Sequence, residues 1–203
     1  MRDAALIEPL SIAVHCCKLA CEMQGETVTV FWDGPVGQLF CSVARAFGAE
    51  SVLVADIVAS RSEFSRQKGS AHTYEMQRIS FRENAAQLLA LTGDTKGSDV
   101  VIDATGAQPC IETGIEALRR GGIFVQAGLG QPNISLPVGL ICDKEAVFRS
   151  FRYTVMGLET TSRQSVWLAP VRWICKVSLL RCFPSLKHSE HLKPSTERRV
   201  LKA

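Results

Sequence analysis

A glycine-rich turn is the part of this sequence whose residue types and spacing best suit chemistry. The apolar run Val28–Phe31 leads into Trp32-Asp33-Gly34-Pro35-Val36-Gly37 and then into a helix-like stretch. Asp56 ends a second apolar run about 20 residues further on, the offset at which a carboxylate reaches the ribose of a bound dinucleotide. Glycines at such a turn let the backbone approach a pyrophosphate at the N-terminus of the next helix. The spacing therefore predicts a dinucleotide site formed by Gly34, Val36, Gly37 and Asp56.

Three residues of this segment bear on which nucleotide binds, and how well. The Asp56 carboxylate can accept bonds from ribose hydroxyls and would repel a 2′-phosphate, so NAD(H) is expected in preference to NADP(H). Arg61 either contacts the adenosine or is a solvated helix residue. Trp32 stands where the motif has its first glycine, and we expect a steric penalty if the turn needs a positive φ angle there. Its indole could also project into the space of the adenosine diphosphate.

The segments around this turn alternate between strand-like and helix-like patterns. Such alternation predicts an α/β fold with a six-stranded, doubly wound parallel sheet of the Rossmann type. We expect helices near 9–21, 36–47, 60–68, 84–91 and 110–118, and strands at 27–32, 51–56, 72–74, 99–103, 122–127 and 146–153.

Composition narrows the class of protein. The chain has 203 residues, of which 46% are hydrophobic and 21% charged, enough for one core. No apolar run is long enough to span a membrane, and the eight cysteines form no C-x-x-C pair. We therefore expect a cytoplasmic protein with reduced, mostly buried thiols. The net charge of +3 is uneven: residues 1–153 carry 14 basic and 17 acidic side chains, and residues 154–203 carry 9 and 3. The basic tail has no dense cluster, so nucleic-acid binding is not expected.

Five short sequence segments, called words below, resemble the second half of a zinc-dependent medium-chain polyol dehydrogenase, of the xylitol (D-xylulose reductase) and sorbitol dehydrogenase type. They occur in the order that such enzymes have, and the resemblance runs from residue 4 to residue 153. The words are Ala4–His15 with its Glu-Pro-Leu, Gly34–Gly37, Val101-Ile-Asp-Ala-Thr-Gly106, Leu118-Arg-Arg-Gly-Gly122 and Ser150-Phe-Arg-Tyr153.

The resemblance implies roles for residues outside the glycine turn. Glu8 would lie at the catalytic zinc and the substrate, and Arg61 against the adenosine. Two turns at the carboxyl edge of the sheet would flank the nicotinamide, and the Phe-Arg-Tyr word would contact cofactor and substrate. The residues concerned are Thr105, Gly106, Ala127, Gly128 and Leu129 for the turns, and Phe151, Arg152 and Tyr153 for the last word. In the absence of the resemblance, Glu8 is simply a favourable charge at a helix start.

The resemblance also defines the expected organisation. Residues 1–23 would be a bridging helix to a GroES-like catalytic domain, residues 24–153 the NAD-binding domain, and residues 154–203 a divergent tail. The resemblance implies that the zinc ligands come from the catalytic domain, which we expect this chain to lack. Because a catalytic zinc needs about three protein ligands, we expect zinc not to be retained and alcohol oxidation to be impaired in this chain alone.

The tail prompts a separate hypothesis. Reading it one base out of frame permits Gly-Asp-rich and helix-forming words, which a polyol dehydrogenase would have there. We therefore expect that the tail from about Thr154 is translated out of frame.

Other interpretations stay open at this point. The chain could be a non-catalytic NAD-binding module that docks on an intact paralogue, or a homo-oligomer. It could be a zinc-independent medium-chain reductase resembling quinone or enoyl reductases, although Glu8-Pro9, Asp56 and the Phe-Arg-Tyr word disfavour that class. It could also be a gene-model fragment without function. The substrate expected for the complete enzyme is a small polyol.

Overall fold

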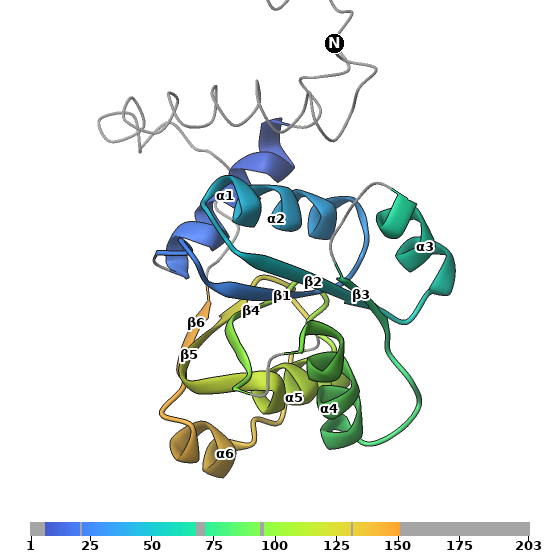
Figure 1. Ribbon diagram of the computed structural model, residues 1–203. Helices are drawn as coiled ribbons and strands as arrows, with labels where there is room; N and C mark the ends of the chain where they lie inside the picture. Colours follow the sequence, from blue (N-terminus) through green and yellow to red (C-terminus); the bar gives the residue numbers. More distant parts are fainter. Residues whose placement is uncertain (1–6, 21, 68–71, 94–95, 131, 151–203) are drawn as a thin grey trace, which may run out of the picture.

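A single parallel sheet organises the chain in a computed structural model (Figure 1), which describes residues 7–20, 22–67, 72–93, 96–130 and 132–150. The strand order is β3-β2-β1-β4-β5-β6, and every neighbouring pair is parallel. The order reverses between β1 and β4, which is the place where such sheets bind ligands. The predicted Rossmann-type architecture is thereby confirmed. The strands are β1 (Thr27–Phe31), β2 (Ser51–Asp56), β3 (His72–Glu75), β4 (Ser98–Asp103), β5 (Leu118–Gln126) and β6 (Val147–Ser150).

Helices cover both faces of the sheet. On one face lie α1 (Ile7–Leu19), α2 (Pro35–Ala46) and α3 (Ala59–Gln67), and on the other lie α4 (Phe81–Thr92) and α5 (Gln108–Ala117) (Figure 1). The short α6 (Val138–Asp143) precedes the edge strand β6. Because parallel strands are joined by crossover helices, the central strands β1, β2 and β4 are buried on both sides and read as nearly continuous apolar runs.

Each face of the sheet has its own core. Side chains from alternate positions of a strand point to opposite faces, so Val28 and Val30 pack under α1 and α2, whereas Phe31 packs toward α4 and α5. Phe40 is fully buried in the first core, and Phe124 is almost fully buried in the second. The two cores hold the carboxyl ends of the central strands in a fixed register.

Local sequence signals explain where the helices start and stop. Gly34 is the N-cap of α2 and Pro35 follows it, where a missing N–H costs nothing. Ser80 and Glu83 form a capping box before α4, and Gly93 ends that helix in the left-handed conformation. These signals are why α4 begins at Phe81, three residues before the predicted start near Asn84.

Other boundaries also differ from the prediction. Strand β1 ends at Phe31 instead of Trp32, because Trp32 adopts a φ of 93° that a strand cannot contain. Strand β5 begins at Leu118, earlier than predicted, and α1 begins at Ile7 and ends at Leu19. The helix α6 had not been predicted. The remaining boundaries lie within two residues of the predicted ones. Of the predicted last strand, residues 147–150 are confirmed, and residues 151–153 lie outside the described residues, as does the whole tail 154–203.

Two predictions, one on membrane-spanning segments and one on the cysteine thiols, can be compared with the structure. In the part of the chain that the structure describes, no helix is long and apolar enough to cross a membrane. None of the described cysteines forms a disulfide: Cys16, Cys17, Cys41 and Cys110 are buried, and Cys142 is exposed. The expectation of reduced, mostly buried thiols fits these five side chains.

Candidate functional site

The glycine turn joins the end of β1 to the start of α2. The Trp32 amide donates to the carbonyl of Ala55 at 2.8 Å, so the turn is still tied to β2 after β1 has ended. A Cβ atom at Gly37 would lie 1.7 Å from the Trp32 carbonyl oxygen. Only glycine allows α2 to approach the turn this closely. The predicted role of Gly37 in close packing is therefore visible in the backbone.

Trp32 has the left-handed backbone conformation that its place in the motif requires. Its φ of 93° lies in a region where non-glycine residues are strained by about 1–3 kcal/mol. Its indole lies directly on Gly34, because a Cβ atom built there would be 2.5 Å from indole Cε2 and 2.9 Å from Nε1. The half-buried indole thus covers the middle of the turn at the N-terminus of α2.

Asp56 ends β2 beside this turn, and its carboxylate is buried and heavily bonded. The side chain accepts the Asp33 amide on Oδ2 at 2.8 Å and the Val58 amide on Oδ1 at 2.9 Å. Arg61, on the first turn of α3, lies 3.1 Å from Oδ2. Arg61 therefore forms an ion pair with the very carboxylate that was predicted to bind ribose, and its predicted contact with the adenosine stays a prediction.

Asp33 is a second buried carboxylate in the same place. Only 5% of the residue is exposed, and its Oδ1 accepts bonds from the Ser65 hydroxyl and the Gln38 amide. Burial raises the pKa of Asp33, as does the nearby charge of Asp56, whereas the bonds from Ser65 and Gln38 lower it. The turn, α2 and α3 thus converge on one carboxyl group.

A third carboxylate organises the turn after β4. Asp103 is fully buried, and it accepts the amides of Thr105 at 2.9 Å and Gly106 at 2.8 Å. It also accepts the Gln126 side-chain amide at 2.7 Å, and that amide donates in addition to the Gly128 carbonyl. Burial raises the pKa of Asp103, and these hydrogen bonds oppose the increase. Asp103 therefore joins the turn after β4 to the turn after β5.

These two turns touch each other through their backbones. A Cβ atom at Gly106 would lie 2.2 Å from the Gly130 nitrogen, and one at Gly128 would lie 2.3 Å from the Gly106 nitrogen. Gly106 has a φ of 67°, which favours glycine as well. The interlocked turns form a wall at the carboxyl edge of the sheet, and Leu129 projects from it with 73% of its surface exposed.

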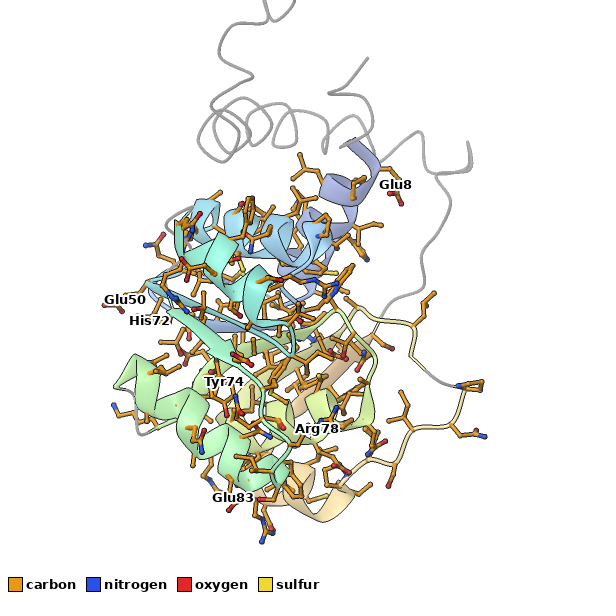
Figure 2. All side chains as sticks on the ribbon, turned by 90° about the vertical axis from the view of Figure 1, so that its right-hand side faces the viewer. Glu8, Glu50, His72, Tyr74, Arg78 and Glu83 are labelled. Carbon is orange, nitrogen blue, oxygen red and sulfur yellow. The ribbon has the colours of Figure 1, made fainter. Side chains whose placement is uncertain are left out.

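The remaining predicted site residues have varied positions. The side chain of Ala127 belongs to the core and Val36 packs against it, so any ligand contact of Ala127 would be made by its backbone. Glu8 is exposed at the outer end of α1 (Figure 2). Phe151, Arg152 and Tyr153 lie outside the described residues.

The described residues do not provide a metal centre. Among residues 7–150, apart from the gaps given above, no group of three or more His, Cys, Asp or Glu side chains could hold a metal ion. Glu8 is thus not part of a ligand set that these residues could complete.

Sequence reasoning missed three polar side chains that hold the site together. Asp33, Asp103 and Gln126 are buried or half-buried, and their bonds position the turns. One signal was present for each aspartate: Asp33 stands inside the glycine turn, and Asp103 ends a strand two residues before Thr105, a spacing typical of an Asx turn. Gln126 had no comparable local signal.

Comparison with known proteins adds family information to this geometry. Residues 35–167 match the family model described as "Zinc-binding dehydrogenase". The chain is 44% identical over 154 residues to D-xylulose reductase A of Aspergillus oryzae, an alignment that covers 75% of this chain and 43% of that protein. It is 43% identical over 173 residues to a probable D-xylulose reductase A of Neosartorya fischeri, covering 82% and 48%. The chain therefore spans less than half the length of these relatives.

Solved structures show the same fold. L-idonate 5-dehydrogenase from Escherichia coli aligns with a TM-score of 0.64 and 26% identity over 84% of this chain and 46% of that one. A putative zinc-binding dehydrogenase from Clostridium scindens aligns with a TM-score of 0.71 and 21% identity over 88% and 48%. A short chain alcohol dehydrogenase from E. coli, solved with NADH, aligns with a TM-score of 0.65 and 20% identity over 81% and 47%.

Proposed function

Because this chain belongs to the zinc-binding dehydrogenase family, we propose that residues 24–153 bind NAD(H) and form the coenzyme half of a polyol dehydrogenase. One observation carries this proposal. The glycine turn after β1 and the carboxylate that ends β2 are directly bonded, Asp33 N–H to Asp56 Oδ2 at 2.8 Å, at the point where the strand order reverses. Open α/β sheets bind dinucleotides at such a point.

Each part of a dinucleotide finds a suitable partner. The diphosphate would lie at the N-terminus of α2, where free amides and the helix dipole favour an anion. The adenosine ribose would bond to Asp56, which requires it to share that carboxylate with Arg61. Ile57, 73% exposed beside Asp56, offers an apolar surface to the adenine.

The nicotinamide would lie against the wall formed by the turns of Thr105-Gly106 and Gly128-Leu129. This wall is rigid, because Asp103 bonds to the first turn and, through Gln126, to the second. A rigid wall fixes the ring in one orientation and keeps water from one of its faces. Bound NAD⁺ supplies the acceptor for a hydride from the substrate carbon.

The proposed substrate of the complete enzyme is a small polyol that is oxidised to a ketose. The names of the relatives, D-xylulose reductase A and L-idonate 5-dehydrogenase, support this class of substrate. The described residues do not provide the ligands of a catalytic zinc. We accordingly propose that this chain by itself binds the coenzyme and is impaired in alcohol oxidation.

The environment and the assembly of the protein belong to the same proposal. We place it in the cytoplasm, where thiols stay reduced, as a homo-oligomer or in association with an intact paralogue. An exposed sheet edge supports such an association, since Val147 and Phe148 of β6 are both partly exposed.

Calorimetric titration with NADH and NADPH tests the proposal. The wild-type chain should bind NADH more tightly than NADPH. Asp56→Ala should weaken NADH and reduce the preference, because it removes both the ribose acceptor and a negative charge. Asp56→Asn keeps an acceptor oxygen and removes only the charge, so it should retain more NADH affinity than the alanine variant. Tighter binding of NADPH than of NADH by the wild type, or no binding of either, would contradict the assignment.

A further inference from the structure

The positive charge of Arg61 offsets the negative charge with which Asp56 would repel a phosphate. Its carboxylate forms an ion pair with Arg61, whose side chain is 44% exposed. Together the two side chains carry no net charge. An exposed arginine beside the ribose is also the kind of residue that accommodates a 2′-phosphate. Asp56 with Arg61 is therefore a poor basis for rejecting NADP(H).

Asp33 changes this balance. Its carboxyl group is buried beside Asp56, and its own amide bonds to Asp56 Oδ2. Its Oδ1 accepts two donors, Ser65 and Gln38, both of which are uncharged. Its Oδ2 is buried and has no hydrogen-bond partner within the described part of the chain. When it is ionised, Asp33 therefore adds a negative charge that its own bonding partners do not neutralise.

The groups that face Asp33 come from three elements. They are Gln38 on α2, Ser65 and Arg61 on α3, and Asp56 on β2. Only Arg61 is a cation, and it is bonded to Asp56. The sum over these groups is one negative charge at neutral pH when Asp33 is ionised, and two donors bonded to one oxygen are what an ionised carboxylate attracts.

We infer that Asp33 is a specificity-determining residue, whose charge makes the ribose end of the site reject a nucleotide 2′-phosphate. This inference rests on the proposed function, since it assumes that the adenosine ribose lies at Asp56. The Asp33 carboxyl is buried, and a buried charge is screened less by solvent than a charge at the surface. Asp33 also acts through position, because its amide holds Asp56 in place.

The test compares 5′-ADP with 2′,5′-ADP, which differ only in the 2′-phosphate, by calorimetric titration. Asp33→Asn keeps the shape of the side chain and an acceptor for Ser65, and it removes the charge. We expect it to tighten 2′,5′-ADP about fivefold relative to 5′-ADP, the order of effect that a charge several ångströms away has in a partly screened site. Binding of 5′-ADP itself should change by less than about twofold. The preference of NADH over NADPH should fall by the same factor.

Two further variants keep the result interpretable. Asp33→Ala removes the same charge without an amide, and the preference should shift in the same direction even if overall affinity drops. Glu50→Gln removes one negative charge directly before β2, at the opposite end of that strand from Asp56 (Glu50 is labelled in Figure 2), and should leave the preference unchanged. An unchanged preference in both Asp33 variants, or equal weakening of both ligands, would overturn the inference and leave Asp33 a structural residue. Failure of the wild type to bind either ligand would instead overturn the proposed function.

Discussion

Replacing Trp32 with glycine is expected to raise the affinity for NADH at least about tenfold, equivalent to about 1.4 kcal/mol. The reason is the position of the indole, which lies on Gly34 at the N-terminus of α2. A diphosphate that approaches the turn must first displace the ring. If displacement exposes about 60 Å² of apolar surface, it costs about 1.5 kcal/mol at about 25 cal/mol per Å². Glycine removes this cost and restores an open turn.

The same substitution should change stability little, because three effects offset each other. Glycine relieves about 1–3 kcal/mol of strain at the φ of 93°. It also raises the entropy of the unfolded chain, by about 0.5–1 kcal/mol, and it gives up the packing of a half-buried indole. A net change within about 1 kcal/mol would shift the melting temperature by about 2–4 °C.

Calorimetric titration of the wild type, Trp32→Gly and Trp32→Ala separates the two causes of weak binding. Trp32→Ala removes the indole but keeps a Cβ atom at the positive φ angle. If the ring obstructs the site, the alanine variant should regain most of the affinity; if backbone strain displaces the turn, only glycine should. Equal affinities in all three proteins would refute the reasoning and show that the ring lies clear of the nucleotide.

Three further predictions concern the rest of the molecule. Metal analysis of the purified chain should give well under one zinc per chain, and tightly held stoichiometric zinc would show that the ligand set has been misjudged. Burial would raise the pKa of Asp99, but bonds from the Thr27 amide, Glu26, Arg119 and the Thr27 hydroxyl lower it to about 2. The ionised Asp99 side chain should therefore stabilise the fold. Asp99→Asn should lower the free energy of unfolding by about 2 kcal/mol at pH 7. The difference between the two proteins in urea unfolding should disappear between about pH 4 and pH 2, as the wild-type carboxylate is protonated. Iodoacetamide at pH 8 should label Cys142 far faster than Cys110, whose pKa burial raises to about 11; equal rates would mean that the second core opens readily.

The fold could be predicted from the sequence because its signals are local and periodic. Val28–Phe31 and Ser51–Asp56 are apolar runs of strand length, and each is followed by a helix-like stretch. Errors arose where a short-range interaction overrides periodicity. Ser80 begins α4 with a capping box, which a search for apolar spacing does not detect. Trp32 ends β1 by its backbone angle, and no apolar pattern indicates that.

The site could be predicted only in part, for a different physical reason. Gly34, Gly37 and Asp56 have a fixed spacing that follows from one strand, one turn and one helix. The bonds of Asp33 to Ser65 and of Asp103 to Gln126 join residues 32 and 23 positions apart, and both depend on how strands and helices pack. Spacing therefore located the turn and the carboxylate predicted to bind ribose, whereas the ion pair of Arg61 and the surroundings of Asp33 became evident only once α3 was placed against β2.

The bond between Arg149 and the Leu19 carbonyl has a consequence for how the chain is made. It joins β6 to the end of α1 across 130 positions of sequence. At the usual rates of synthesis, about 5–20 residues per second, the ribosome needs roughly 7–26 s to add the residues between them. During that interval the Leu19 carbonyl lacks its Arg149 donor, whereas the first core, which contains no residue of β6, can form from the elements made before that strand. The carboxyl end of α1 thus gains this bond last, after the core that the helix helps to build.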